Sequence, residues 1–279
     1  MELRPPSPAF CDLAQRLRSD DESVSLGEAS LVLAGEFQPG IDADAARAEL
    51  ARLGAEAART LPPNGSLAVR AAGLLAYLHT SCGFRGNEQQ YDDPRNSFLP
   101  EVLSRRTGIP ITLSIVAIEV AAHARLPLLG VSFPGHFLVR SVDDPPVVLD
   151  AFHGRVLDTA DLTLLLRRAL GPEAQLEPGQ LEPARPRDVL VRMLANLKHG
   201  YASRREWVHA VDCCDRILLL APEAAGELRD RGLLYEQLEC FGPALDDLER
   251  YLALAPRAPE ADALRARIDV IRAQAARIN

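Results

Sequence analysis

One segment, residues 94–154, most constrains how this chain can fold. Its residues 110–124 (PITLSIVAIEVAAHA) are apolar on nearly every side, and Glu119 is the one charge in their middle. A helix that is apolar all round lies buried at the centre of a domain. Pro110 suits the first position of such a helix, where its missing N–H costs no hydrogen bond. We therefore predict a central core helix that begins at Pro110.

Short apolar runs follow this helix and predict a small antiparallel sheet. Pro134-Gly135 and the DDPP sequence at 143–146 are typical of turns between strands. The runs between these turns give three expected strands: Leu128–Phe133, His136–Ser141 and Val147–Leu149. Residues 157–170 then predict a helix that covers the sheet.

The segment before the core helix is expected to be mainly helical. Residues 41–61 give a long alanine-rich helix capped by Asp42, and a PPNG sequence ends it. Ser66 can cap the next helix, which is followed by a polar, glycine-containing loop at 83–95. A short helix capped by Asn96 or Ser97 should run through Leu103, and we expect Gly108 to close it in the left-handed conformation.

From Arg187 onward the chain is helical in pattern and repeats with a period of 34 residues. Small alanines and terminal prolines at this period resemble the tetratricopeptide repeat, with Gly232 at its close-packing position. The first repeat departs from the pattern by having Lys198 where Gly232 would correspond. Residues 258–276 are expected to form the final capping helix. The matching pairs are Tyr201 and Tyr235, Ala210 and Ala244, Asp212 and Asp246, Arg216 and Arg250, Leu218 and Leu252, Leu220 and Leu254, and Pro222 and Pro256.

Composition narrows the class of protein. The 279 residues suggest about two domains, and 47% hydrophobic with 25% charged residues is the balance of a folded protein. The net charge of −8 argues against a general nucleic-acid binder, which needs a basic face to bind phosphates. No apolar run reaches the roughly 20 residues of a membrane span, and residues 1–25 lack the apolar core of a secretory signal.

Five cysteines occur at irregular spacing, and they predict neither a disulfide framework nor a paired metal site. We expect reduced thiols, a cytoplasmic location and no cofactor. Cys82 ends a predicted helix, which is the wrong helix end for stabilising a thiolate, so we interpret it as a packing residue.

His136 and Asp150 are the main candidates for a catalytic site. His136 is expected at the start of one strand, directly after a Pro-Gly turn, and Asp150 ends the neighbouring strand. An aspartate in that place can accept the imidazole N–H and orient the ring, as in a catalytic triad. The other interpretation of His136 is a turn histidine with a structural hydrogen bond.

Thr112 and Ser114 are candidate nucleophiles, because they lie in the first two turns of the core helix, where the helix dipole stabilises a developing anion. Hydroxyls in such helices often bond to the backbone instead, and a serine hydroxyl has a much higher pKa than a thiol. His136, Asp150 and His153 are also of metal-ligating types, but no H-x-x-x-H spacing supports a metal site, and we expect none.

Four further residues are candidates for binding. Asn96 lies in the polar stretch before the core helix and either stabilises that stretch or lines a cleft. Glu119 either faces the site as a buried acid, which would need a partner such as Arg105, Arg106 or Arg140, or lies exposed on a rim. Tyr201 and Tyr235 are interpreted first as helix-packing residues and second as part of a concave groove for a peptide or partner protein. Two repeats make a small groove, so the repeats either present it freely or dock on the preceding domain.

Residues 67–168 resemble the transglutaminase-like core, and with the repeats behind them the whole chain resembles the SirB-type family. The sequences that carry the match are DPRNSFLPEVLSRRTGIPITLSIVAIEVA, LPLLGVSFPGHFLVR and LDAFHG. The resemblance implies an α+β fold of the papain or transglutaminase type, with a core helix against a small antiparallel sheet. It divides the chain into an N-terminal helical region (1–65), the core (66–170), a Pro-, Gly- and Glu-rich linker (171–186) and the helical repeats (187–279).

The same resemblance bears on activity. Transglutaminase-like enzymes carry their nucleophilic cysteine at the start of the core helix, near the pattern Gly-x-Cys. Gly108-Ile109-Pro110 puts Pro110 at that position, while His136 and Asp150 match the histidine and aspartate. Pro110 and the 34-residue period together therefore predict a non-catalytic, regulatory protein that binds a protein or peptide. The alternative is a hydrolase or acyltransferase that uses Ser114 or Thr112 with His136 and Asp150.

Overall fold

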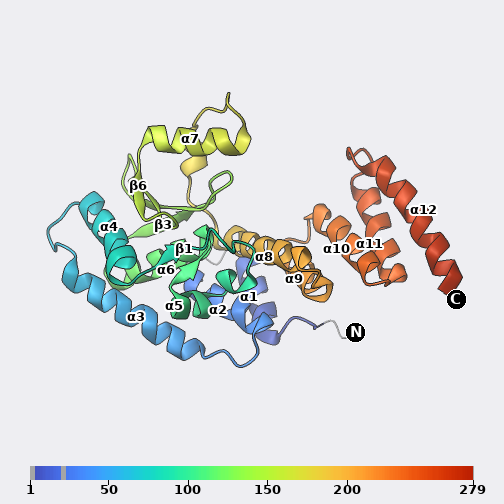
Figure 1. Ribbon diagram of the computed structural model, residues 1–279, viewed down its shortest axis with the longest axis horizontal. Coiled ribbons are helices and arrows are strands. Elements are labelled where there is room, and N and C mark those ends of the chain that lie inside the picture. Colours follow the sequence, from blue (N-terminus) through green and yellow to red (C-terminus); the bar gives the residue numbers. More distant parts are fainter. Residues whose placement is uncertain (1–3, 20–22, 279) are drawn as a thin grey trace. The chain divides into compact units, whose positions relative to one another are not determined.

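The computed structural model describes residues 4–19 and 23–278 and divides the chain into two compact units (Figure 1). One unit comprises residues 22–190, and the other combines residues 1–21 with residues 191–279. The six described strands all belong to the first unit, which we call the core unit; we call the second the repeat unit. Helix α8 (Pro186–Ser203) contains the boundary between them. The expected α+β class is confirmed.

The core unit is a layered arrangement of helices on a small sheet. Its strands form a parallel pair, β1 (Arg85–Gly86) with β2 (Thr107–Gly108), and an antiparallel meander of β3 (Leu128–Val131), β4 (Leu138–Ser141), β5 (Val148–Asp150) and β6 (Arg155–Leu157). Its helices are α2 (Leu26–Phe37), α3 (Ala43–Thr60), α4 (Leu67–Ala76), α5 (Leu99–Arg105), α6 (Pro110–His123) and α7 (Thr159–Leu170). Shorter turns are a π-helix at Tyr77–Ser81 and 3-10 turns at Pro94–Ser97 and Pro178–Leu181.

Helix α6 is the centre of this unit, as its apolar sequence predicts. It lies between α3 and the meander, and α2 and α5 also pack against it (Figure 1). Each of its first eight residues, Pro110 to Ala117, is buried. Burying one leucine or isoleucine side chain contributes about 1.5–3 kcal/mol, so this helix supplies much of the driving force for folding.

The meander has one face toward α7. Leu138 and Val148 share that face and form a cluster with Leu162 and Leu166 of α7, whereas Val139 and Leu149 are directly paired across the strands and point to the opposite face. Strand β6 is absent from the sequence prediction. Its three residues are too few to show a period, and the expected helix at 157–170 begins two residues later, at Thr159, after the N-cap Asp158.

The left-handed residue between α5 and α6 is Arg106, with φ of 54°, so the expectation for Gly108 is wrong. Gly108 pairs in β2 instead, and glycine is required there by close packing. A Cβ at this position would lie 2.8 Å from Thr112 Oγ1 and 3.1 Å from both Val102 methyl groups.

Residues 171–186, expected to be a linker, pack on the sheet in the structure. Ala174, Leu176 and Leu181 lie against the cluster under α7. The Ala184 N–H donates to Gly130 O at 2.8 Å, and Arg140 donates to Leu181 O at 2.9 Å. The proline and glycine content therefore reflects an irregular path over the sheet surface rather than a free spacer.

The repeat unit consists of helix pairs. After α1 (Pro8–Arg18), which packs on α9, come α8, α9 (Trp207–Leu220), α10 (Ala225–Gln237), α11 (Phe241–Leu254) and α12 (Ala261–Ile278). The 34-residue period places Ala210 in α9 and Ala244 in α11, and both are fully buried. No helix among the described residues is long and apolar enough to cross a membrane.

Gly232 marks the closest approach of α10 and α11. A Cβ there would lie 2.8 Å from Leu248 Cγ and 3.2 Å from Ala244 O. Lys198 occupies the corresponding place in α8. Its amino group instead points to α10 and lies 2.7 Å from both Glu227 and Asp230. The departure from the repeat pattern is thus explained by an ion-pair cluster.

Gly232→Ala should destabilise the repeat unit by about 1–3 kcal/mol, because the added methyl overlaps Leu248 and a helix backbone. Chemical unfolding monitored by circular dichroism measures the loss. Gly226→Ala in the same helix is the matched control: nothing lies within 4 Å of its Cβ, so alanine should be neutral or slightly stabilising. Equal effects of the two changes would contradict the packing described.

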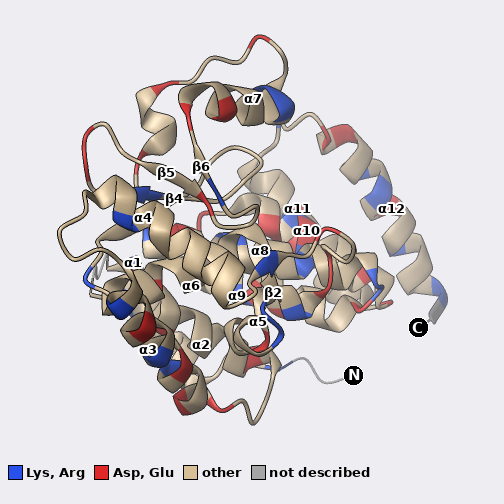
Figure 2. Ribbon diagram, turned by 60° about the vertical axis from the view of Figure 1, so that its left-hand side comes forward, with Lys and Arg blue, Asp and Glu red and all other residues tan. Residues whose placement is uncertain are grey.

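Acidic and basic side chains alternate along α3 (Figure 2). Glu49 bonds to Arg52 at 2.8 Å and also to Arg106, which joins α3 to the end of α5. The hydrogen bond from Arg52, helped by Arg106 and opposed by partial burial, lowers the pKa of Glu49 from 4.5 to about 2.

Because this pKa is lower in the folded protein, the stabilisation is present above about pH 4.5 and is lost as pH falls toward 2. Glu49→Gln should therefore cost about 1 kcal/mol at pH 7 and much less at pH 3. Urea unfolding at both pH values measures this. Asp44→Asn, at an exposed ion pair of the same helix, should change little at either pH. A Glu49→Gln effect that does not change with pH would contradict the argument.

Candidate functional site

His136 lies in the turn between β3 and β4, two residues before β4 begins, rather than within the strand. Its N–H donates to Phe133 O at 3.1 Å, which fixes the backbone of the turn. The side chain is 11% exposed, and its Nε2 lies 3.0 Å from Oδ1 of the fully buried Asp150 at the end of β5. The structure therefore brings together the two residues that sequence reasoning singled out.

The carboxylate of Asp150 accepts hydrogen bonds from more than one imidazole. His153 Nδ1 lies 2.7 Å from Oδ2, and the backbone N–H groups of Phe152 and His153 donate to Oδ1 at 2.9 and 3.1 Å. Burial raises the pKa of Asp150, but the hydrogen bonds and charges of His136 and His153 outweigh it and hold the pKa well below its usual range. Asp150 is thus an ionised carboxylate at the centre of the site.

His153 is the most accessible member of this group, with 42% of its side chain exposed. Its ring stacks on that of His136, with centroids 5.8 Å apart and planes inclined by 27°. Its other nitrogen, Nε2, is 3.9 Å from Glu88. The sequence signal for this arrangement is the D-x-x-H spacing of Asp150 and His153 within one tight turn.

The turn from Asp150 to Gly154 is held from two sides. Nε2 of His79, in the π-helical turn after α4, donates to Ala151 O at 2.9 Å. The Gly86 N–H at the end of β1 donates to Phe152 O at 3.2 Å, and the Tyr91 ring contacts the Phe152 ring edge-on at 6.2 Å. The loop after β1 therefore forms one wall of the site.

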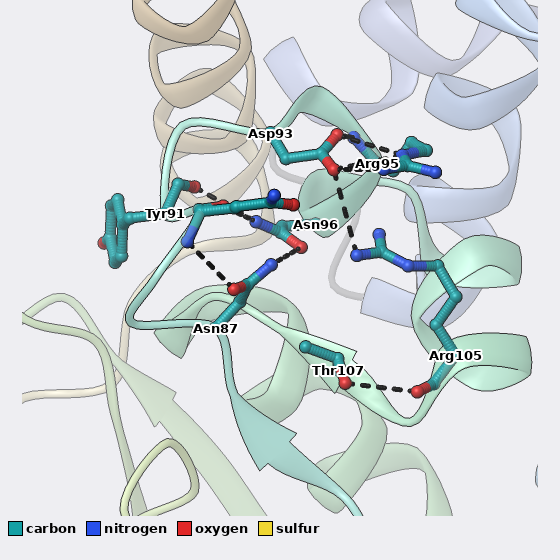
Figure 3. A network of polar contacts seen from close by, with 8 residues as sticks. Asn87, Tyr91, Asp93, Arg95, Asn96, Arg105 and Thr107 are labelled. Carbon is teal, nitrogen blue, oxygen red and sulfur yellow. Dashed lines mark hydrogen bonds and ion pairs between the residues drawn. The ribbon is translucent and has the colours of Figure 1, made fainter.

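Asn96 anchors that loop (Figure 3). Its side-chain nitrogen donates to Gln90 O at 2.7 Å and Tyr91 O at 3.1 Å, and its side-chain oxygen accepts from Asn87 at 3.0 Å. The residue is fully buried. The Asn96 amide thus stabilises the loop after β1, which is the first of the two roles considered for Asn96 from the sequence.

An ion-pair group continues this network (Figure 3). The buried Asp93 carboxylate lies 2.7 Å from Arg95 and 3.8 Å from Arg105 of α5. Asp93 also caps the 3-10 turn by accepting from the Arg95 N–H at 3.0 Å. The turn that carries Asn96 is therefore fixed to α5.

Among the described residues, neither candidate hydroxyl is hydrogen-bonded to an imidazole. Thr112 Oγ1 accepts the Ile109 N–H at 3.2 Å, and its proton can be donated to Asn96 O at 2.7 Å or Ile109 O at 3.1 Å, so the hydroxyl joins the start of α6 to the turn that carries Asn96. Ser114 is fully buried, and its Oγ has no hydrogen-bond partner among the described residues. Both hydroxyls belong to the packed core, and catalytic roles for them stay predictions.

Glu119 lies on the side of α6 that meets α2. Its Oε1 accepts the Gly27 N–H at 2.7 Å, in the first turn of α2, where a carboxylate is favourable. Burial raises the pKa of Glu119, against the lowering effect of this bond. The expected arginine partner is replaced by a helix N-terminus.

The two tyrosines of the repeats are packing residues. Tyr201 is 6% exposed and stacks on His209 at 4.9 Å, while Tyr235 is 8% exposed and lies near Arg231. The groove of the repeat unit is elsewhere and has a volume of about 430 Å³. It is lined by residues of α8, α10 and α12, among them Lys198, His199, Leu233, Gln237 and Arg267.

Comparison with known proteins identifies the family of this chain. A model of the transglutaminase-like superfamily matches residues 44–195, and a tetratricopeptide-repeat model matches residues 197–269. The chain belongs to the transglutaminase-like superfamily. The SirB-type resemblance is also confirmed by relatives that align over most of the chain.

A UPF0162 protein of Xylella fastidiosa is 43% identical over 252 residues, which cover 88% of this chain and 89% of the relative. A UPF0162 protein of Vibrio cholerae is 31% identical over 90% of this chain and 94% of its own. Protein SirB1 of Salmonella typhimurium is 31% identical over 200 residues, 71% of this chain and 74% of its own.

The resemblance noted from the sequence places the nucleophile expected for acyl transfer at the start of the core helix. Here the residue is Pro110, buried at the first position of α6. A proline has neither a thiol nor a hydroxyl. The transglutaminase-like site of this chain therefore combines a histidine and an aspartate with a helix start that carries no nucleophile at that residue.

Asn96→Asp should destabilise the core unit by about 2–4 kcal/mol, because it places a carboxylate against the carbonyl oxygens of Gln90 and Tyr91. Thermal or urea unfolding at pH 7 measures the loss. The matched control is Asn64→Asp in the exposed turn after α3, which should change stability by less than about 0.5 kcal/mol. A silent Asn96→Asp would show that the network does not hold the loop.

Proposed function

We propose that this chain is a non-catalytic member of its superfamily, a pseudoenzyme that binds a protein or peptide and regulates it. The observation that carries the proposal is Pro110 at the start of α6. In a thiol-dependent acyl transfer the nucleophile forms the covalent intermediate, and its loss removes nearly all of the rate.

The histidine and aspartate have a structural task that explains their presence without catalysis. Asp150 accepts from two imidazoles and two backbone N–H groups, so it organises the turn that follows β5. Removing a buried carboxylate of this kind leaves its donors unsatisfied, at a cost of about 1–3 kcal/mol for each one left buried. The dyad can therefore be retained for folding alone.

The groove of the repeat unit supports a binding role, since tetratricopeptide repeats generally mediate protein interactions. Leu233 and Leu234 give it an apolar floor, while Lys198 and Arg267 stand beside Asp230 and Glu236. These charges are paired, with 2.7 Å between Lys198 and Asp230 and 2.8 Å between Arg267 and Glu236. Such a surface suits a peptide with an apolar anchor and polar flanks.

A cytoplasmic location is part of the proposal. All five cysteines are free thiols in the structure, in keeping with a reducing compartment. Cys213 and Cys214 are neighbours in α9 and are fully buried, and burial raises the pKa of both thiols, which makes them unreactive packing residues.

A hydrolase or acyltransferase is the second candidate. The observation that favours it is the unpaired Ser114 hydroxyl near the start of α6, since a buried hydroxyl without a partner calls for an explanation. Its complete burial argues against it, because a nucleophile has to reach both its base and the substrate.

The activity test compares the wild-type protein with His136→Gln on activated esters and on a glutamine-donor peptide with an amine acceptor. We expect no turnover above the uncatalysed rate with either protein. Turnover that His136→Gln lowers by at least about a hundredfold would overturn the pseudoenzyme proposal, since general base catalysis contributes about that much.

The binding test places a photo-crosslinking amino acid at Gln237, an exposed residue that lines the groove. The control is the same amino acid at Gln274, exposed on α12 and outside the groove lining. We expect a discrete protein adduct in cells from position 237 and none from position 274. Adducts of equal yield at both positions, or at neither, would contradict a partner in the groove.

A further inference from the structure

The group formed by His136, Asp150 and His153 offers more than a dyad. Each residue supplies one metal-ligating atom, and the three atoms all lie within 4.8 Å of one another. Asp150 ends β5 and His153 follows it in the next turn, whereas His136 lies in the turn before β4, so the D-x-x-H spacing reveals only two of the three ligands. Two imidazole nitrogens and one carboxylate oxygen form a ligand set found in zinc and non-haem iron sites.

The three side chains are held before any ligand arrives. Asp150 is fixed by the N–H groups of Phe152 and His153, and it in turn orients both rings at 3.0 and 2.7 Å. The turn that carries His153 is held by His79 and by the end of β1. Preorganised ligands of this kind lower the entropy lost when an ion binds.

The geometry is close to that of a bound ion. Ligand atoms that stand about 2.0–2.2 Å from one tetrahedral metal ion lie about 3.3–3.6 Å from each other. The three atoms lie within 4.8 Å of one another, and the two rings stand 3.0 and 2.7 Å from Asp150, so shifts of about 1 Å, which the half-exposed His153 ring can make, bring them to that separation. The ion would replace the two imidazole protons now donated to Asp150.

The chemistry of the donors selects the ion. Imidazole nitrogens favour Zn²⁺ and other first-row divalent metals over Ca²⁺ and Mg²⁺, which prefer oxygen ligands alone. Three protein ligands leave at least one coordination position, and the exposed side of His153 gives that position access to solvent. Glu88, 3.9 Å from His153 Nε2, adds negative charge beside it.

We propose that His136, Asp150 and His153 form a binding site for one divalent first-row transition metal ion, with Zn²⁺ as the preferred ion. The open position takes a water molecule or an oxygen of a bound peptide. This inference is independent of the groove in the repeat unit and of the absent nucleophile.

The test uses the full-length, tag-free protein after treatment with a chelator. Calorimetric titration with Zn²⁺ should give one site per chain, and Co²⁺ should give visible absorption bands of a site with nitrogen and oxygen ligands. His153→Gln should weaken Zn²⁺ binding at least about tenfold, in line with the effect of losing groups around a metal. His199→Gln, at an exposed histidine of α8, is the matched control and should bind as the wild type does.

His153→Gln is the decisive variant, because its exposed side chain can change without loss of the fold; its unfolding midpoint in the absence of metal checks this. His136→Gln adds a second ligand variant. Absence of a one-to-one site, or Zn²⁺ binding that His153→Gln and His136→Gln leave unchanged, would overturn the inference. Neither result bears on the turnover and crosslinking outcomes, so the two proposals fail separately.

Discussion

Burial of α6 on every side is the constraint on which the core unit depends. A helix enclosed by α2, α3, α5 and the meander has room for few polar groups, and each one present has a defined position. Thr112 serves the start of the helix, and Glu119 accepts from the start of α2. Ser114 is left without a partner. The same burial that stabilises the fold separates the Thr112 and Ser114 hydroxyls from solvent and therefore from substrates.

The site at the end of the meander is organised by hydrogen bonds to a buried charge rather than by apolar packing. Asp150 is buried as a charge, which is unfavourable unless the charge is fully hydrogen-bonded, and four N–H groups satisfy it. Two of them are imidazole N–H groups, which orient the rings of His136 and His153 toward one carboxylate. A rigid, ionised centre of this kind keeps its shape without a nucleophile, and its donor set is the one a transition metal prefers. The proposed loss of acyl transfer and the retention of a precise polar site are therefore compatible.

Much of the fold and of the site could be predicted where the sequence pattern that determines it is local. The continuous apolar run gave α6, the Asp42 and Ser66 caps bond to Ala45 N and Val69 N as expected, and the proximity of His136 and Asp150 followed from two neighbouring strand ends. The 34-residue period gave the helix pairs. These features depend on residues close in sequence or on a strong period.

Features that depend on distant partners could not be predicted. Asn96 is one polar residue among several in its stretch, and nothing local shows that its amide bonds to Gln90 O and Tyr91 O. Arg106 adopts the left-handed conformation and its side chain pairs with Glu49 on another helix, whereas sequence rules favour the nearby glycine. Residues 171–186 have the composition of a linker, and only the apolar cluster between the meander and α7 explains why they pack.

Covalent labelling tests most directly whether His136 activates a nucleophile. We propose that it activates none. The protein is incubated with a fluorophosphonate, which reacts with activated hydroxyls, and the adduct is located by mass spectrometry. We expect no adduct on Thr112 or Ser114 in the wild-type protein. A stoichiometric adduct on either residue that disappears in His136→Gln would contradict it and identify an enzyme.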